Sequence, residues 1–249
     1  MDSLKNQYRE RRSQFWDNML NFFTMQLVIL AAGRGKRMRA LTENLPKPLL
    51  TVLGNNLLER KISILPKEID EVIIVIGYFG EKIKKHFGAS FKGKRILYVE
   101  QEELLGTMPA LKETEKILNG RFMVMMGDDV YNREDVLACL KHPWAILVKK
   151  VTDKSRGARV IIDDKKHITD IVEGAELEKG MWNNAGLYVL QKDIFKYPLV
   201  QIPSGEFGLP QTLAKAAKDF DISMVESKSW HQISTPEDLA RVEKLLLTK

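Results

Sequence analysis

The sequence predicts an α/β fold in which helices flank a mixed, mostly parallel β-sheet. From residue 25 onward, short apolar runs alternate with stretches of helical periodicity, which is typical of right-handed βαβ units. Continuous apolar runs such as residues 72–76 suit strands that are covered on both faces. After about Lys150 the expected strands have only short connections, which indicates a small β-rich subregion.

The expected elements follow one another without a linker, repeat or low-complexity stretch. Thr235 is an expected helix N-cap, with Pro236 at the first helical position and Asp238 at the third. The expected strands are 26–32, 71–77, 96–99, 122–126, 145–151, 158–163, 167–172 and 186–190. The expected helices are 57–69, 81–87, 109–118, 133–140, 209–219 and 236–247. We therefore expect one domain over residues 25–249.

Residues 1–24 stand apart as an N-terminal extension. Apolar side chains between Phe15 and Phe23 recur at near-helical spacing behind a charged stretch. Asp17 interrupts the apolar part, which is too short for a secretory signal. The extension is read either as an amphipathic helix docked on its own domain or a partner, or as a stretch upstream of a start at Met25. Contact with a membrane surface is less favoured.

The composition limits the classes of function. No run of 18 or more uncharged apolar residues occurs, so the sequence predicts no membrane-spanning segment. The single cysteine, Cys139, excludes an intramolecular disulfide and lies in an apolar stretch, where a buried small hydrophobe is expected. These features fit a reducing compartment, and we expect a cytoplasmic protein.

The net charge of +6 is concentrated in two segments. Residues 33–47 carry five cations against one acid in a glycine-containing loop, which suggests a phosphate ligand. Residues 81–95 carry six cations, and a solvated helix face is expected there. Nucleic-acid binding calls for basic residues interleaved with exposed aromatics or for a known module. The sequence has neither, so we expect no nucleic-acid partner.

The most informative motif is a strand that runs into the turn Gly33-Arg34-Gly35. Glycines let backbone N–H groups close on a phosphate chain, and Lys47 returns between two prolines to add a cation. The turn lacks the third glycine of a dinucleotide-binding motif and the Gly-Lys-Ser/Thr ending of a P-loop. A turn that stabilises phosphates during group transfer is therefore the favoured interpretation.

Residues 30–49 resemble the signature of the sugar-phosphate nucleotidyltransferase family, Leu-Ala-(Ala/Gly)-Gly-x-Gly-x-Arg with a later Pro-Lys-Pro. The resemblance runs from residue 25 to the C-terminus. It implies a Rossmann-like (GT-A-like) fold and Mg²⁺-dependent transfer of a nucleotidyl group from an NTP to a small phosphate ester. Further matches, in order, are Gln101 with Gly106-Thr107, Gly127-Asp128, Gly157, Glu173, Asn184-Ala185-Gly186 and Trp230-x-x-Ile233-x-Thr235-Pro236-Glu237-Asp238-Leu239.

The resemblance also implies roles. Arg37 would hold the β- and γ-phosphates, Lys47 would bridge the α-phosphate and the attacking oxygen, and Asp128 would bind Mg²⁺. No side-chain nucleophile is needed, because an ionised phosphate attacks. The implied nucleotide-binding residues are Leu30, Ala32, Gly33, Arg34, Gly35, Lys36, Gln101, Gly106 and Thr107. The implied acceptor-binding residues are Gly157, Glu173, Asn184 and Gly186, all in or beside the β-rich subregion.

The chain departs from the family pattern at two positions. Gln232 replaces the second metal carboxylate, so the expected metal ligands are Asp128 and Gln232. Glu173 is followed by Gly174 where many members have Lys-Pro, and Lys179 is a candidate substitute.

Several other side chains have plain structural readings. Asp129 is read as a helix-start acid rather than a group supporting the metal. Trp182 and Trp230 are read as core or rim residues, with the acceptor pocket as the alternative for Trp182. For Arg34 and Arg39 a solvated loop charge and a functional residue stay equally open.

The substrates are predicted less directly. Residues 126–131 most resemble the corresponding segment of cytidylyltransferases that act on inositol-1-phosphate. The glutamine at 101, with Gly106-Thr107, favours a pyrimidine base. We therefore expect CTP and inositol-1-phosphate, giving CDP-inositol and pyrophosphate. A hexose-1-phosphate uridylyl-, thymidylyl- or guanylyltransferase is the alternative within the class, and a non-catalytic nucleotide-sugar-binding subunit is the alternative outside it. No hexapeptide repeats occur, so no acetyltransferase activity is expected, and an oligomer stays open.

Overall fold

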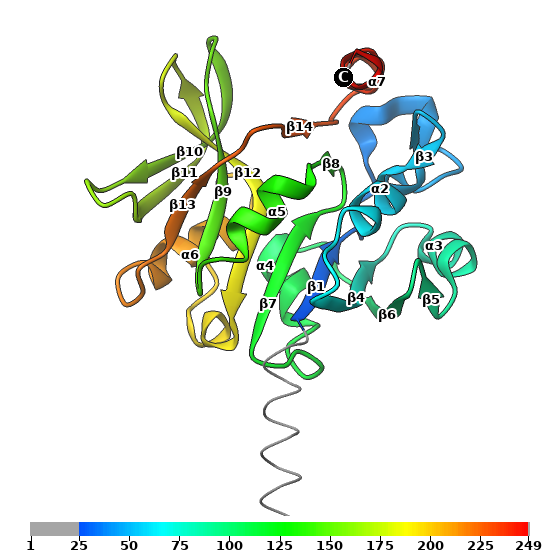
Figure 1. Ribbon diagram of the computed structural model, residues 1–249, viewed down its shortest axis with the longest axis horizontal. Coiled ribbons are helices and arrows are strands. Elements are labelled where there is room, and N and C mark those ends of the chain that lie inside the picture. The colour runs from blue at the N-terminus through cyan, green and yellow to red at the C-terminus, as the bar shows by residue number, and fades with distance from the viewer. Residues whose placement is uncertain (1–24, 249) are drawn as a thin grey trace, which may run out of the picture.

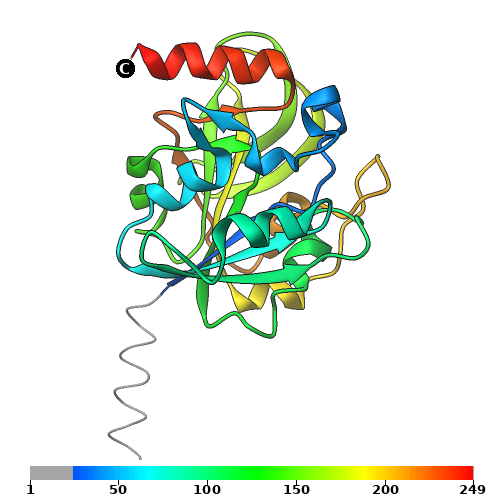
Figure 2. The same ribbon diagram turned by 90° about the vertical axis from the view of Figure 1, so that its right-hand side faces the viewer.

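The computed structural model describes residues 25–248, so the expectations for residues 1–24 lie outside the described part. A ten-stranded mixed sheet runs through it, with helices on both faces (Figures 1 and 2). Its centre is parallel: β1 (Met25–Leu30) lies between β7 (Arg121–Met126) and β4 (Ile69–Ile76), and β4 pairs with β6 (Lys94–Glu100). The predicted Rossmann-like α/β fold is confirmed.

Antiparallel strands extend this centre on one side. β12 (Trp182–Gln191) pairs with β7, with β9 (Ala145–Lys150) and with β10 (Ser155–Ile162). β10 in turn pairs with β11 (Ile168–Leu177), while β13 (Ser223–Glu226) runs parallel to β9. In Figure 1 the ends of β9 and β10 project beyond the parallel strands at the upper left, where the sequence predicts a β-rich subregion.

The continuous apolar runs are explained by two separate cores, one on each face of the sheet. Along β4, Val72 and Ile74 point into one core, and Ile73 and Val75 point into the other. Because both faces are covered, every position of the run is buried. The helices on the first face are α2 (Leu57–Ser63), α3 (Gly80–Phe87) and α5 (Arg133–Cys139), and those on the second are α4 (Thr107–Lys112) and α6 (Leu209–Ala216).

Cys139 is fully buried in the first core, as predicted for a small hydrophobe. Burial raises the pKa of its thiol far above the ordinary value, because the thiolate is disfavoured away from water. None of the helices in residues 25–248 is long and apolar enough to cross a membrane.

Three helices end earlier than predicted, and one of them, expected at 209–219, ends as α6 at Ala216. The helix expected at 57–69 ends three residues before Pro66, because the residue preceding a proline is disfavoured in the α conformation. In place of the helix expected at 109–118, the structure has α4, which ends at Lys112. Beyond it the buried Thr114 hydroxyl donates to the Leu111 carbonyl (2.6 Å), and several amides bond three residues back. This tighter turn replaces the expected helical continuation.

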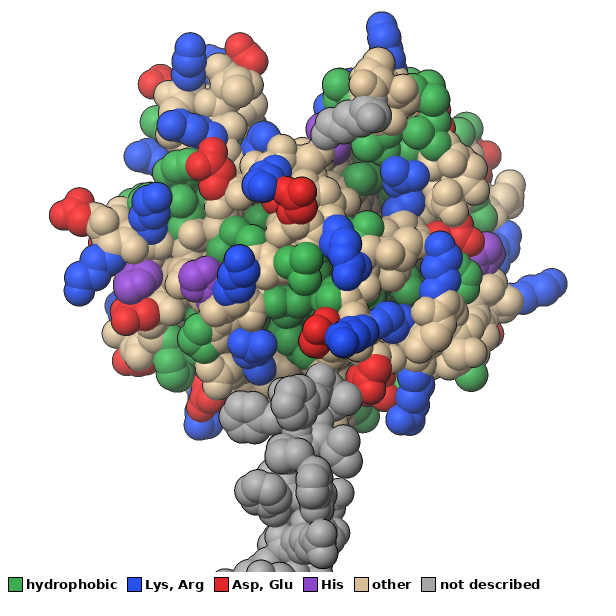
Figure 3. All heavy atoms as spheres, viewed as in Figure 1, with side chains coloured by type: hydrophobic (Ala, Val, Ile, Leu, Met, Phe, Trp, Pro, Cys, Tyr) green, Lys and Arg blue, Asp and Glu red, His purple; other side chains and the backbone are tan. Residues whose placement is uncertain are grey.

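The C-terminal helix α7 (Pro236–Leu247) begins as predicted. The Thr235 hydroxyl accepts from the Asp238 amide (3.3 Å), and the Asp238 carboxylate accepts from the Thr235 amide (3.0 Å). In Figure 1, α7 and β3 form a second projection opposite the β9–β10 ends, and β14 crosses between the two. Figure 3 shows the surface hollowed between these projections.

The sequence pattern did not predict several short elements. They are the 3₁₀ helices η1 (Lys36–Thr42), η2 (Lys47–Leu49) and η3 (Lys192–Lys196), and the short strands β2 (Thr51–Val52), β3 (Asn55–Asn56), β5 (Ser90–Phe91), β8 (Asp129–Val130) and β14 (His231–Gln232).

Candidate active site

Two cavities lie side by side at the carboxyl ends of β1 and β7. The larger, of about 700 Å³, and the smaller, of about 260 Å³, share Thr107, Met126 and Glu206 in their walls. Ligands of open α/β sheets bind at this end of the strands. The larger cavity is lined by all residues expected to act in catalysis or nucleotide binding: Leu30, Ala32, Gly33, Arg34, Gly35, Lys36, Arg37, Lys47, Gln101, Gly106, Thr107 and Asp128. The smaller is lined by the expected acceptor residues Gly157, Glu173, Asn184 and Gly186, and by Gln232.

The glycine turn after β1 brings backbone and cations together. Gly35 has φ 64°, a left-handed conformation, and a Cβ there would stand 2.9 Å from the Lys47 Cβ. Glycine at this position therefore lets η2 pack directly against the turn. The Arg34 guanidinium lies over the Tyr78 ring, 5.5 Å from its centroid. The Arg39 side chain is 78% exposed, lies 4.0 Å from Glu237 and does not line the cavity, as expected for a loop charge.

Lys47 and Asp128 meet across the larger cavity. The Lys47 Nζ lies 2.6 Å from the Asp128 carboxylate. Gly127 sets the position of this carboxylate, since its amide donates to the Leu30 carbonyl (2.9 Å) and a Cβ would stand 2.7 Å from that oxygen. The turn after β7 thus approaches the end of β1 as only glycine permits.

The segment expected to read the base is ordered around Gln101. Its backbone amide donates to the Ile76 carbonyl (2.9 Å), and its side-chain Nε2 donates to the Gly106 carbonyl (3.2 Å). The side-chain Oε1 is thereby directed as an acceptor for a ligand N–H. Gly106 has φ 117°, and a Cβ there would stand 2.4 Å from the Phe207 carbonyl oxygen.

Residues 201–208 connect the two cavities. The Phe207 amide donates to the Leu105 carbonyl (2.8 Å), and its carbonyl accepts from the Met108 amide (3.1 Å). The Thr107 hydroxyl accepts from the Leu209 amide (2.8 Å) at the start of α6. The segment around residues 105–108 and the wall of the smaller cavity therefore form one hydrogen-bonded unit.

The smaller cavity is shaped by two glycines and an asparagine. A Cβ at Gly157 would stand 2.5 Å from the Asn183 Oδ1, and one at Gly186 would stand 2.6 Å from the Met126 Cγ. Asn184 accepts from the Gly186 amide (2.9 Å) and donates to the Tyr188 hydroxyl (2.7 Å). Its amide is thus held in one orientation against the cavity.

Gln211 is a cavity-lining residue that the sequence analysis missed. Both polar atoms of its side chain are buried without a hydrogen-bond partner among the described residues. Buried amide groups are normally bonded, so Gln211 is an unsatisfied polar group in the wall of this cavity. Trp230 also lines the cavity, whereas Trp182 and Lys179 do not. No lysine, arginine or histidine is among the residues that line it.

The reading of Asp129 as a helix-start acid is wrong. Asp129 is buried in β8, and the acids at the start of α5 are Glu134 and Asp135. Burial and the neighbouring Asp128 charge raise the pKa of Asp129. The sequence analysis also missed the fully buried Lys61, whose ammonium reaches the same turn.

The expected metal ligands come from adjacent strands. Gln232 on β14 pairs with Asp129 on β8, and the Ile233 amide donates to the Asp128 carbonyl (3.3 Å). No cluster of three or more His, Cys, Asp or Glu residues that could hold a metal occurs in residues 25–248. The Asp128 carboxylate, 31% exposed, lines the larger cavity, and Gln232 lines the smaller one. Carboxylate and amide oxygens are ligand types that Mg²⁺ accepts together with phosphate oxygens.

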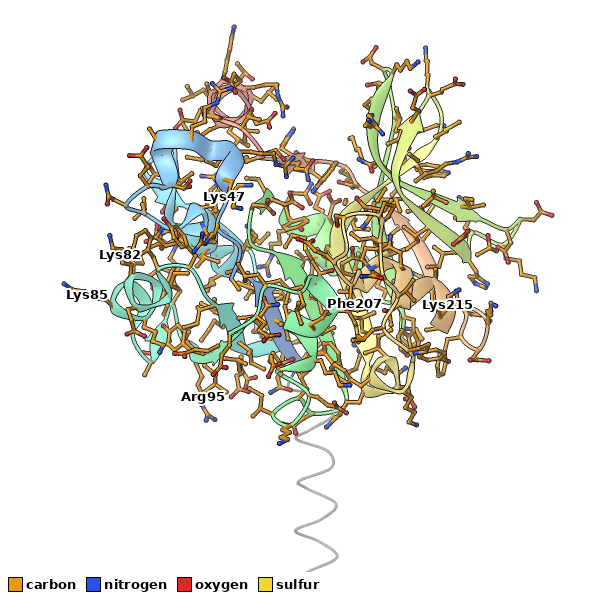
Figure 4. All side chains as sticks on the ribbon, turned by 180° about the vertical axis from the view of Figure 1, so that it is seen from behind. Lys47, Lys82, Lys85, Arg95, Phe207 and Lys215 are labelled. Carbon is orange, nitrogen blue, oxygen red and sulfur yellow. The ribbon has the colours of Figure 1, made fainter. Side chains whose placement is uncertain are left out.

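The second basic segment lies elsewhere. Figure 4 shows Lys82, Lys85 and Arg95 at the outer surface, away from Lys47. Lys84 lies 2.7 Å from Glu81 and from Glu100. None of residues 81–95 lines either cavity, which agrees with the expected solvated face.

Comparison with known proteins gives a family match over the described region. The family model for nucleotidyl transferase matches residues 26–249. The chain is 30% identical over 230 residues to the bifunctional protein GlmU of Methanocaldococcus jannaschii, covering 90% of this chain and 55% of that protein. It is 32% identical over 173 residues to the D-glycero-alpha-D-manno-heptose 1-phosphate guanylyltransferase of Campylobacter jejuni, covering 69% of this chain and 78% of that protein. The chain thus spans about half the length of its GlmU relatives.

Solved structures share the fold. A candidate glucose-1-phosphate thymidylyltransferase from Bacillus anthracis superposes with a TM-score of 0.78 at 24% identity, covering 89% of this chain and 95% of that one. The inositol-1-phosphate CTP transferase from T. maritima superposes with a TM-score of 0.74 at 20% identity, covering 90% and 96%. At these identities the likeness concerns the arrangement of the backbone.

Proposed function

The chain belongs to the nucleotidyl transferase family, and from this premise we propose that it joins an NTP to a small phosphate ester and releases pyrophosphate. The observation that carries the proposal is the joining of two cavities beside one ion pair. Lys47 and Asp128 stand in the larger cavity with Arg37, and the smaller cavity opens beside it through shared walls. A nucleotide and an acceptor could therefore meet with their phosphates between these side chains.

The chemistry needs charge stabilisation rather than a protein nucleophile. An oxygen of the acceptor phosphate forms a bond to the α-phosphorus, and the bond from that phosphorus to the leaving pyrophosphate breaks. Lys47 would lower the repulsion between the two phosphates, and Arg37 would stabilise the charge that grows on pyrophosphate. Mg²⁺, held by Asp128 and Gln232, would neutralise phosphate charge and orient the reacting groups.

For the substrates we propose CTP and inositol-1-phosphate as the first candidates. The acceptor position of the Gln101 amide is compatible with a cytosine amino group or with an imide N–H. A smaller cavity lined by carboxylates and amides without a cation suits a neutral ring rich in hydroxyl groups. The fold shared with an inositol-1-phosphate CTP transferase is compatible with this choice.

A hexose- or heptose-1-phosphate is the second candidate, because a relative at 32% identity is named as a heptose-1-phosphate guanylyltransferase. A sugar ring also offers a neutral, hydroxyl-rich surface to the smaller cavity. The catalytic unit that we propose for either substrate is residues 25–249.

One experiment separates these candidates. Pyrophosphate release is measured for CTP, UTP, dTTP, GTP and ATP, each with inositol-1-phosphate, glucose-1-phosphate and a heptose-1-phosphate. If kcat/KM is highest for CTP with inositol-1-phosphate, the first candidate is supported. If it is highest for another nucleotide and acceptor, that pair replaces the first candidate. Stabilisation of the protein by nucleotides without any pyrophosphate release would instead support the non-catalytic subunit.

A further inference from the structure

A buried lysine lies directly beneath the Asp128 turn. Lys61 is on α2, on the apolar face that also carries Leu57, Leu58 and Ile62, and its side chain is buried with only 1% of the residue exposed. Neither cavity reaches it. Burying an ammonium is unfavourable unless its donors are bonded, so a lysine at this position requires specific partners.

Three carbonyl oxygens accept from the Lys61 ammonium. They belong to Gly127 (3.0 Å), to Asp129 (2.5 Å) and, one helical turn back, to Leu57 (3.4 Å). The first two are the carbonyls on either side of Asp128 in the chain. Lys61 therefore bridges the turn from below while Lys47 holds the Asp128 carboxylate from the cavity.

Other contacts fix the turn only in part. The Gly127 amide is bonded to Leu30, and the Asp128 carbonyl is bonded to Ile233. These two contacts use the Gly127 amide and the Asp128 carbonyl. The carbonyls of Gly127 and Asp129 accept instead from Lys61. An apolar side chain of similar length would fill the same space but leave these two buried carbonyls without that donor.

We propose that Lys61 is a positioning residue, which holds Asp128 at the place where the nucleotide and its Mg²⁺ require a carboxylate. The proposal rests on the proposed nucleotidyl transfer. Lys61 touches no substrate and acts through the Gly127-Asp128-Asp129 backbone. Small displacements of a charge-bearing group at a reacting centre cost rate steeply, so loss of the bridge should lower turnover more than it lowers stability.

The test compares Lys61→Met with Gln26→Met in the full chain. Gln26 is a matched control, because its buried amide donates to the Ile117 carbonyl (3.0 Å) at the opposite end of β1, away from both cavities. Three quantities are measured: pyrophosphate release with the best substrate pair of the wild type, the Mg²⁺ concentration for half-maximal rate, and hydrogen exchange of residues 123–131 without ligands.

For Lys61→Met we expect kcat to fall by about a hundredfold, the half-maximal Mg²⁺ concentration to rise, and exchange across the Asp128 turn to accelerate. Gln26→Met should lower the melting temperature and leave Mg²⁺ dependence and turn exchange unchanged. If Lys61→Met keeps kcat within threefold, or loses activity with the Mg²⁺ dependence and turn exchange of the wild type, Lys61 is core support only and the proposal fails.

Two further arms keep the result decisive. If Lys61→Met does not fold, Lys61→Gln, which keeps an uncharged donor, is measured in the same way and should show the same changes to a smaller degree. If the wild type releases no pyrophosphate with any pair, the proposed function fails. Unchanged turn exchange in the variant would then still refute the bridge, and faster exchange would support it.

Discussion

The Lys47 ammonium and the Asp128 carboxylate are joined at 2.6 Å, although 81 residues separate them in the chain. The Lys47 side chain is only 7% exposed, and this carboxylate is the acidic group paired with it. The pair forms because Gly35 lets η2 pack on the glycine turn after β1, and Gly127 lets the turn after β7 approach the end of β1. Each cation or anion of the site thus has a place defined by a neighbouring glycine.

Replacing Lys47 by methionine should remove the charge that offsets two approaching phosphates. We expect kcat to fall by about a hundredfold or more, which corresponds to a loss of about 3 kcal/mol in transition-state stabilisation. Lys85→Met, which removes a surface charge of α3, is the control and should stay near wild type. Steady-state pyrophosphate release measures both, and equal rates for the two variants would exclude Lys47 from catalysis.

Arg37→Ala should lower kcat about a hundredfold, a cost of about 3 kcal/mol, because charge on pyrophosphate grows toward the transition state. The KM for the acceptor should change little. Arg39→Ala offers a close comparison, since Arg39 lies two residues on, in the same 3₁₀ helix, and outside both cavities. Kinetics that hardly distinguish the two alanine variants would make Arg37 another loop charge.

The metal site can be probed by changing its charge. Asp128→Asn should nearly abolish turnover, and Gln232→Asp should lower the Mg²⁺ concentration that gives half-maximal rate, because it adds a carboxylate beside the ion. A Mg²⁺ titration of pyrophosphate release at saturating nucleotide checks both. Activity in Asp128→Asn would show that the metal binds elsewhere. An unchanged titration in Gln232→Asp would place residue 232 away from it.

Gly106→Ala should disturb base binding and stability together. The added methyl would stand 2.4 Å from the Phe207 oxygen in a backbone conformation with φ 117°. We expect a cost of about 1–3 kcal/mol, a melting temperature lower by several degrees, and a raised KM for the nucleotide. Gly93→Ala is the control, because Gly93 also has a positive φ, 75°, but open space around an added Cβ. It therefore separates backbone strain from a clash between the added methyl and its neighbours. A similar nucleotide KM in both variants would contradict this reading.

Gln211→Leu should raise the KM for the acceptor about fivefold, as expected for one lost hydrogen bond of about 1 kcal/mol, and leave the KM for the nucleotide unchanged. Lys215→Leu, at an exposed position one turn further along the same helix, is the control (Figure 4). If both variants keep the wild-type acceptor KM, the unbonded Gln211 amide faces no substrate group.

The sheet and the positions of most of the expected site residues could be predicted because the signals for them are local in the sequence. Strand runs such as 72–76 and turns such as 33–35 carry their conformation in consecutive residues. All residues expected in catalysis, in nucleotide or acceptor binding or as metal ligands line one of the two cavities. The end of α2 and the short α4 were predicted less well, because Pro66 and the Thr114 hydroxyl act against the helical periodicity around them.

Lys61 and Gln211 were missed because long-range contacts give them their setting. Lys61 finds its carbonyl partners 66 and 68 residues later in the chain. Its only local signal is a charge on the apolar face of α2, between Leu58 and Ile62. Gln211 lines a cavity whose other walls come from segments far away in the chain, such as Gly157 and Glu173. Periodicity carries no information about such pairs.

The ladder between Phe207 and Leu105 bears on how such a protein can change its substrates. Sequence changes in residues 201–208 that suit a new acceptor also move the backbone that carries Leu105 and Gly106. If the proposed roles hold, we expect the choice of base and the choice of acceptor to change together. A chimera that receives residues 201–208 from a relative should need the partner segment 101–108 from the same donor to regain selectivity for its nucleotide.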